Sequence, residues 1–132
     1  MTKIDSTARV SSKAHIGKDV EIGPWSIIHE NTIIEDDCCI GAFCELGLRT
    51  DLALQTGLRI GASSTIRSHS IVYEGSSFGG GLVTGHRVTI RENTIAEEGL
   101  QVGSLSELQG NISIGRHVKC HSNVHICQTA KL

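Results

Sequence analysis

The chain lacks the residue types that fill most compact cores and that mark anchored or nucleic-acid-binding proteins. Of its 132 residues only four are aromatic and one is proline. With 12 basic against 14 acidic residues, no broad positive field for nucleic acid is expected. No segment approaches the roughly 18 apolar residues of a membrane span. A core this short of rings must be filled by regularly placed aliphatic side chains.

The first ten residues and the cysteine count bear on the cell compartment. The segment MTKIDSTARV has no apolar run, which argues against a secretory signal peptide. Five cysteines are an odd number, and without a secretory signal they are typical of reduced thiols rather than of a disulfide framework. We therefore expect a cytoplasmic protein, and the length of the chain predicts a single domain over residues 1–132.

Aliphatic residues recur at every sixth position along nearly the whole chain. Steps of six from residue 10 to residue 52, and again from residue 60 to residue 132, visit 21 positions, of which 18 hold Val, Ile, Leu or Phe. Glycine often follows, and a second, mostly small residue stands two positions earlier, so that both side chains point the same way on an extended strand. A period of six does not match the 3.6 residues of a helical turn. The pattern predicts short strands with inward aliphatic side chains, joined by tight turns.

This pattern resembles the hexapeptide-repeat family, [LIV]-G-x-x-x-x, over nearly the whole chain. The resemblance implies an all-β, left-handed parallel β-helix in which three hexads form one triangular coil of 18 residues, so that the chain would contain about seven coils. The phase slips by two residues within LGLRTDLALQTGLRIG, from Leu46 to Gly61. We interpret the slip as two extra residues in a short loop near residues 47–60, with Leu52 still facing inward. The loop is either a tolerated insertion or a contact to ligand or to a neighbouring subunit.

If packing accounts for the inward positions, the chemistry must lie at the corners and on the outward faces. Residues 18 apart share a corner, and one corner is expected to stack Ser68, His86, Ser104 and Ser122. The hexad of His86 departs from the rule, because Thr84 replaces the inward aliphatic residue, and local rules tend to fail where function competes with packing. An imidazole is well suited to accept a proton near neutral pH. His86 is therefore the candidate catalytic residue, and a polar corner or subunit-contact role is the alternative.

Two stretches, IGPWSII (Ile22 to Ile28) and IGASSTIRSHSIVYEGSSFGGGLVTGHRVTIREN (Ile60 to Asn93), resemble acyltransferases that modify amino sugars of bacterial surface polysaccharides. The resemblance implies a homotrimer with active sites in clefts between subunits. It also implies a histidine that deprotonates an amine or hydroxyl of a nucleotide-linked sugar, which then attacks the thioester of acetyl-CoA or of an acyl carrier protein. Such a reaction requires no metal. Outward-facing Trp25 and Ile27 are available for partner packing.

Five further residues are candidates for substrate binding. The arginines suit phosphate groups of a nucleotide or of CoA, although a solvated arginine is the alternative for each. The carboxylate suits a sugar hydroxyl or the orientation of His86, although pairing with a neighbouring arginine is its alternative. The histidine lies diagonal to His86 at the same corner. The candidates are Arg67, His69, Arg87, Arg91 and Glu92.

Two other functions stay open. The hexapeptide carbonic anhydrase-like proteins bind a metal between chains with three histidines, and His86, His121 and His125 come close to that pattern, with three residues rather than four between the last two. Within one chain the repeat separates these side chains, so no metal site is expected there. The chain also ends at HICQTAKL with Leu132 in an inward position and no C-terminal cap. A non-catalytic scaffold or fragment, with its last coil covered by further coils or another chain, is therefore the third alternative.

Overall fold

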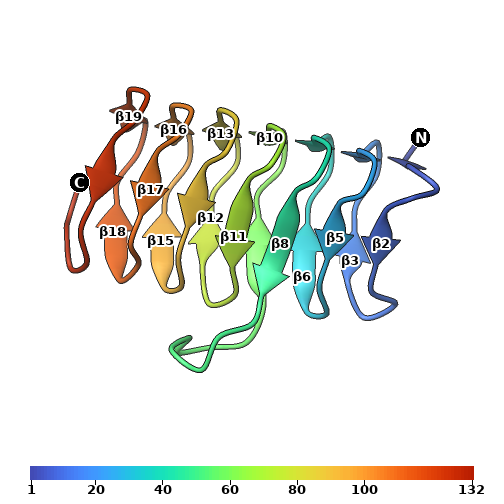
Figure 1. Ribbon diagram of the computed structural model, residues 1–132, viewed down its shortest axis with the longest axis horizontal. Helices are drawn as coiled ribbons and strands as arrows, with labels where there is room; N and C mark the ends of the chain where they lie inside the picture. The colour runs from blue at the N-terminus through green and yellow to red at the C-terminus, as the bar shows by residue number, and fades with distance from the viewer.

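The computed structural model describes all residues, 1–132, as strands and turns without a helix. The strands form a left-handed parallel β-helix of about seven coils, and the two termini lie at opposite ends of the stack (Figure 1). The fold class predicted from the sequence is confirmed. The structure has no helix with the length and hydrophobicity needed to cross a bilayer.

The coils contribute one strand each to three parallel sheets, which we call sheets A, B and C, except that the last coil adds no strand to sheet C. Sheet A contains β1 (Lys3–Ile4), β4 (Glu21–Ile22), β7 (Cys39–Ile40), β10 (Thr65–Ile66), β13 (Val83–Thr84), β16 (Gln101–Val102) and β19 (Lys119–Cys120). Sheet B contains β2 (Arg9–Val10), β5 (Ile27–Ile28), β8 (Glu45–Leu48), β11 (Ile71–Tyr73), β14 (Thr89–Ile90), β17 (Glu107–Leu108) and β20 (His125–Ile126). Sheet C contains β3 (His15–Ile16), β6 (Thr32–Ile34), β9 (Leu58–Ile60), β12 (Ser77–Phe78), β15 (Thr94–Ala96) and β18 (Ile112–Ile114).

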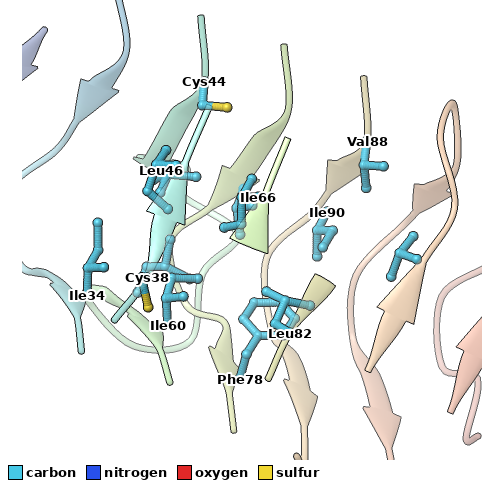
Figure 2. Close-up of a cluster of buried hydrophobic side chains, with 14 of the residues drawn as sticks. Ile34, Cys38, Cys44, Leu46, Ile60, Ile66, Phe78, Leu82, Val88 and Ile90 are labelled. Carbon is cyan, nitrogen blue, oxygen red and sulfur yellow. The ribbon is translucent and has the colours of Figure 1, made fainter. Parts of the chain in front are cut away.

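The core is one continuous column of 22 buried hydrophobic residues. Figure 2 shows part of it, with residues such as Ile34, Leu46, Ile60 and Ile90 brought together from successive coils. The column follows the six-residue period, and the smaller inward positions hold buried Cys38 and Cys44 as expected. Leu132 was predicted to face inward, but its side chain is exposed. At the end of the stack a coil packs on only one side of Leu132, so its side chain remains in contact with solvent.

The insertion is longer than the sequence phase indicated. Elsewhere paired residues are 18 positions apart, as in Ile28↔Leu46, whereas across the insertion Leu46 pairs with Val72, which is 26 positions later (72 − 46). The coil therefore contains eight extra residues (26 − 18), not two. The prediction that Leu52 faces inward was wrong, because its side chain is 61% exposed. One six-residue step of the apparent repeat falls in the loop. Because eight exceeds two by one full period of six, an eight-residue insertion shifts the repeat by the same phase as a two-residue insertion.

The inserted loop, residues 49–57, extends from the coil stack between β8 and β9 (Figure 1). It lies against the corner that joins sheets B and C. Asn93 holds it there, donating through Nδ2 to the carbonyl of Leu52 at 3.0 Å and accepting at Oδ1 from the amide of Leu54 at 2.9 Å. Glu74 accepts from the amide of Thr50 at 3.1 Å. The loop is therefore tied to its own chain by side chains of the two coils that follow it.

The three corners, named A–B, B–C and C–A after the sheets they join, share one backbone conformation. From Asp19 onward the turns have a residue with positive φ, and 14 of these residues are not glycine. The stacks predicted for the corners are confirmed where contacts test them, because Ser68 contacts His86 and the amide of His86 contacts Ser104. Side-chain size differs between corners. The B–C and C–A corners hold glycine, asparagine and other polar residues at the positive-φ position, whereas the A–B corner holds Trp25, Phe43, His69, Arg87, Leu105 and Asn123.

Candidate functional site

His86 stands at the A–B corner, directly after β13, and its side chain is exposed. The backbone amide of His86 donates to Ser104 Oγ, one coil further on, at 2.9 Å. Its ring nitrogen Nδ1 lies 2.8 Å from Ser68 Oγ, one coil before. Two serines of the same corner column therefore fix the backbone and the ring of His86.

The contact to Ser68 has a chemical consequence for the imidazole. Nε2 of His86 makes no hydrogen bond within the chain. If Nδ1–H donates to Ser68 Oγ, the lone pair of Nε2 is free to accept a proton from an acceptor substrate. A neutral imidazole with one nitrogen held and the other free is the form that a general base requires.

Arg67 lies beside this column at the end of β10. Its backbone amide donates to Thr84 Oγ1 and its Nη1 donates to the Thr84 carbonyl, both at 3.3 Å. Thr84 replaces an inward aliphatic residue and is fully buried. Its hydroxyl therefore accepts a hydrogen bond within the coil stack and does not face outward. Arg67 also lines a shallow cavity of about 280 Å³ together with Gly85, Ser104 and His121.

His69 and Arg87 occupy the positive-φ positions on the coils around His86. The His69 ring stacks on Phe43, with 5.1 Å between ring centroids and 17° between planes. The Arg87 side chain is exposed and forms no hydrogen bond or ion pair within the chain. Arg67, His69 and Arg87 therefore share the A–B corner region with His86.

Arg91 and Glu92 lie at the B–C corner, on the other side of sheet B. Arg91 Nη2 donates to Glu92 Oε1 at 2.9 Å, and the guanidinium lies 4.4 Å from the centroid of the Tyr73 ring. Glu92 is only 1% exposed. The predicted alternative, pairing with Arg91, is confirmed, but the pair has a buried carboxylate rather than a surface one. Within a single chain these two residues are not brought together with His86.

No three histidine, cysteine, aspartate or glutamate side chains of the chain converge into a metal-binding group. His121 follows β19 at the A–B corner, whereas His125 lies on β20, 3.8 Å from Glu107. All five cysteines are free thiols. Burial raises the pKa of the Cys38 and Cys44 thiols above the ordinary value, so neither is a ready thiolate nucleophile.

Residues 13–47 match the family model described as bacterial transferase hexapeptide (six repeats). That stretch, about a quarter of the chain, is therefore similar to the hexapeptide repeat of bacterial transferases. No curated protein matches this hexapeptide-repeat chain by sequence. Among solved structures it is similar to the UDP-N-acetylglucosamine acyltransferase from Campylobacter jejuni (14% identity, 96% of this chain and 68% of that one, TM-score 0.51). It is also similar to the corresponding acyltransferase from Francisella novicida (13% identity, 99% and 60%, TM-score 0.62).

These likenesses to solved structures bear on the fold alone, because identities of 13–14% are low. The chain spans 60–68% of the length of those two structures. The role of each candidate residue in this hexapeptide-repeat protein therefore depends on the geometry described above.

Sequence reasoning missed a histidine that pairs with a carboxylate elsewhere in the chain. His29 Nε2 lies 2.7 Å from Glu45 Oε2, and both side chains are half-buried near the start of the inserted loop. Arg49 and Glu30 pair beside it at 3.0 Å. The signal was available in the register, since Glu45 pairs with Ile27, two residues before His29. Sequence spacing alone did not bring the two together, because His29 lies just beyond the end of β5.

Proposed function

We propose that this protein transfers an acyl group, the acetyl of acetyl-CoA, to an amine or hydroxyl of a nucleotide-linked sugar. The observation that carries the proposal is the exposed imidazole of His86, held through Nδ1 by Ser68 and free at Nε2. The family, whose model is described as a transferase, supports the reaction class. The two similar structures, both named as UDP-N-acetylglucosamine acyltransferases, support the choice of a sugar acceptor.

In this proposal His86 acts as the general base. Nε2 takes the proton from the acceptor N–H or O–H as the acceptor atom attacks the thioester carbon. The carbon–sulfur bond then breaks, and the imidazolium returns its proton to the leaving thiolate, so that the histidine is regenerated. Backbone N–H groups at the turns are suited to stabilise the negative charge on the carbonyl oxygen. When Ser68 Oγ accepts the hydrogen bond from Nδ1–H, the Nε2 lone pair is free for the first step.

Arg67 and Arg87 are the residues proposed to bind phosphate groups. Both lie near His86 at one corner, and Arg87 has no partner within the chain. A guanidinium binds phosphate oxygens through two parallel hydrogen bonds. Arg91 and Glu92 take part only if a neighbouring copy brings its B–C corner to this site. A homotrimer is therefore part of the proposal, with His69 at the margin of the cleft.

The runner-up donor is a longer acyl chain carried by an acyl carrier protein. Within one chain the cavity beside Arg67 is shallow, about 280 Å³, so the acyl group would also have to contact the neighbouring copy. Parallel assays with acetyl-CoA and with an acyl-loaded carrier protein separate the two donors. If only the acyl-loaded carrier protein supports turnover, the carrier protein and not acetyl-CoA is the donor.

His86→Asn tests the base directly. We expect the turnover number for acyl transfer to fall by ~10²-fold or more, with an unchanged unfolding temperature because the side chain is exposed. His117→Asn is the matched control, since His117 is also an exposed corner histidine but lies at the C–A corner. Near-normal turnover of the His86 variant would reject the catalytic role.

A further inference from the structure

A shallow cavity of about 660 Å³ lies at the N-terminal end of sheet B, where the sheet meets the B–C corner. The first two coils supply most of its lining, and Arg49 of the inserted loop completes it. His86 is elsewhere, on the fifth coil and at the A–B corner. Small-molecule sites commonly have volumes of roughly 300–1,000 Å³. The cavity therefore has the size of a ligand site that the proposed acyl transfer does not use.

The cavity combines an apolar floor with polar walls. Ile27, the outward residue of β5, lies between Arg9 and Glu45 in the register of sheet B and contributes to the floor. The polar lining residues are Arg9, Ser11, His29, Glu30 and Arg49. An apolar surface with a few converging polar groups is the usual composition of a small-molecule site.

His29 brings a hydrogen-bond acceptor to this cavity. Its Nε2 lies 2.7 Å from Glu45 Oε2, and the two side chains are 29% and 30% exposed. When the carboxylate of Glu45 accepts from Nε2–H, the neutral ring has its lone pair at Nδ1. Nδ1 makes no hydrogen bond within the chain. It is therefore available to accept a hydrogen bond from a hydroxyl group of a ligand.

Positive charge is in excess among the groups that line the cavity. Glu30 is already paired, because Arg49 Nη1 lies 3.0 Å from its Oε1 and Lys13 Nζ lies 3.9 Å from its Oε2. The exposed side chain of Arg9 has neither a hydrogen bond nor an ion pair within the chain. Three other cavities of the N-terminal coils have more acidic than basic lining groups. This cavity differs from those three in attracting an anion.

We propose that this cavity binds a small phosphate ester that carries a free hydroxyl group, such as a sugar phosphate. Arg9 and Arg49 bind phosphate oxygens, because a planar guanidinium pairs with phosphate through two parallel hydrogen bonds. Ser11 Oγ accepts from a backbone amide at 3.1 Å and keeps its own proton to donate. His29 Nδ1 accepts from the hydroxyl, and Ile27 contacts the carbon skeleton. Three donor side chains match the three terminal oxygens of a phosphate ester, whereas a carboxylate has only two.

The inserted loop contributes directly to this site. Arg49 is its first residue, and the pair with Glu30 fixes the start of the loop against the second coil. Asn93 holds the middle of the loop through Leu52 and Leu54. Of the two interpretations of the insertion, a tolerated change of length or a contact to ligand, this proposal takes the second. It does not depend on the proposed function, because the two sites share no residue.

Calorimetric titration of the full chain with glucose 1-phosphate, inorganic phosphate and glucose tests the ligand class. We expect glucose 1-phosphate to bind more tightly than inorganic phosphate, since only the ester reaches His29 and Ile27, and glucose to give no measurable binding. Failure of both phosphates to bind at millimolar concentration would overturn the proposal. Equal affinities for the two phosphates would overturn it as well, because the hydroxyl and the carbon skeleton would then contribute nothing.

Arg9→Gln tests the position of the phosphate. Loss of a charge-assisted hydrogen bond should weaken the binding of glucose 1-phosphate by about 10-fold or more, with an unchanged unfolding temperature because Arg9 is exposed and unpaired. Arg116→Gln, which changes an exposed arginine of the C–A corner, is the matched control and should bind as wild type does. Wild-type affinity in Arg9→Gln would overturn the proposal, and so would a loss confined to Arg87→Gln, which would place the phosphate near His86.

Proton–carbon NMR of the histidine rings locates the hydroxyl contact. The ring signals of His29, assigned by their loss in His29→Asn, should shift when glucose 1-phosphate is added, whereas those of His117 should not. A shift confined to His86 would contradict the site at the B–C corner. The Glu45→Gln variant should reduce the shift at His29, because glutamine does not hold the ring in the same tautomer.

This site and the proposed function fail separately. Arg9→Gln should transfer acyl groups at the wild-type rate, and His86→Asn should bind glucose 1-phosphate with wild-type affinity. A chain that transfers acyl groups but binds no phosphate ester at Arg9 would refute this site alone. A chain that binds the ester at Arg9 and keeps its turnover in His86→Asn would refute the base alone.

Discussion

The A–B and B–C corners have the same backbone turn and comparable polar residues, yet they differ in what covers them. At the B–C corner the inserted loop and Arg91 enclose Glu74, Glu92 and Asn93, and each carboxylate or amide has a partner within the chain. At the A–B corner His86 and Arg87 remain exposed. Buried, satisfied polar groups stabilise a fold, whereas exposed, unpartnered ones are free to bind. The B–C corner is therefore stabilised by contacts within the chain, whereas the A–B corner carries the residues for which we propose chemistry.

Asn93→Ala should give the largest loss of stability at the B–C corner. The amide of Asn93 joins Leu52, Leu54 and Asn111, and its φ is 61°. Loss of the buried hydrogen bonds, with alanine in a left-handed conformation, should lower the free energy of unfolding by about 3 kcal/mol. Urea unfolding measures it. Asn31→Ala is the control, because Asn31 has the same conformation but no side-chain hydrogen bond; an equal loss in both variants would show that the loop contacts contribute nothing.

Glu92→Gln should have a smaller effect on stability. Glutamine keeps the shape and one acceptor for Arg91 but removes the charge from a buried pair, which should cost about 1–2 kcal/mol. Acyl transfer measured with the folded variant should be close to wild type if Glu92 only positions Arg91. A loss of turnover as large as that of His86→Asn, without a loss of stability, would show that Glu92 at the B–C corner takes part in the reaction.

The buried thiols give a smaller effect that appears only above neutral pH. Burial raises the pKa of Cys38 and Cys44 in the folded chain, while an unfolded thiol titrates near about 8.5. Above that pH the unfolded chain binds fewer protons than the folded one, so the free energy of unfolding falls as pH rises. Below it the contribution is fully present. In the Cys38→Ala, Cys44→Ala double variant, the free energy of unfolding should fall less steeply with pH above about 8.5. Urea unfolding at several pH values measures this, and the same slope as in wild type would show that the two thiols do not cause the decline.

The sequence predicted the fold well because the inward positions are set by packing, and packing repeats. Ile22, Ile28, Ile34 and Ile40 face inward as the period requires. The outward position of His86 followed from the same period. The partners of the corner residues were less predictable, because contacts such as Asn93 to Leu52 span 41 residues and depend on the path of a loop. A period describes which way a side chain points, not what covers it.

The length of the insertion shows this limit most clearly. An eight-residue insertion and a two-residue insertion leave the hexads in the same phase, so Leu52 satisfied the pattern while lying in the loop. Leu52→Ser should therefore change the free energy of unfolding by no more than about 0.5 kcal/mol. Leu46→Ala, one hexad earlier and fully buried, should cost about 2–5 kcal/mol. Thermal and urea unfolding of the two variants side by side test the register, and comparable losses would mean that the loop leucine belongs to the core after all.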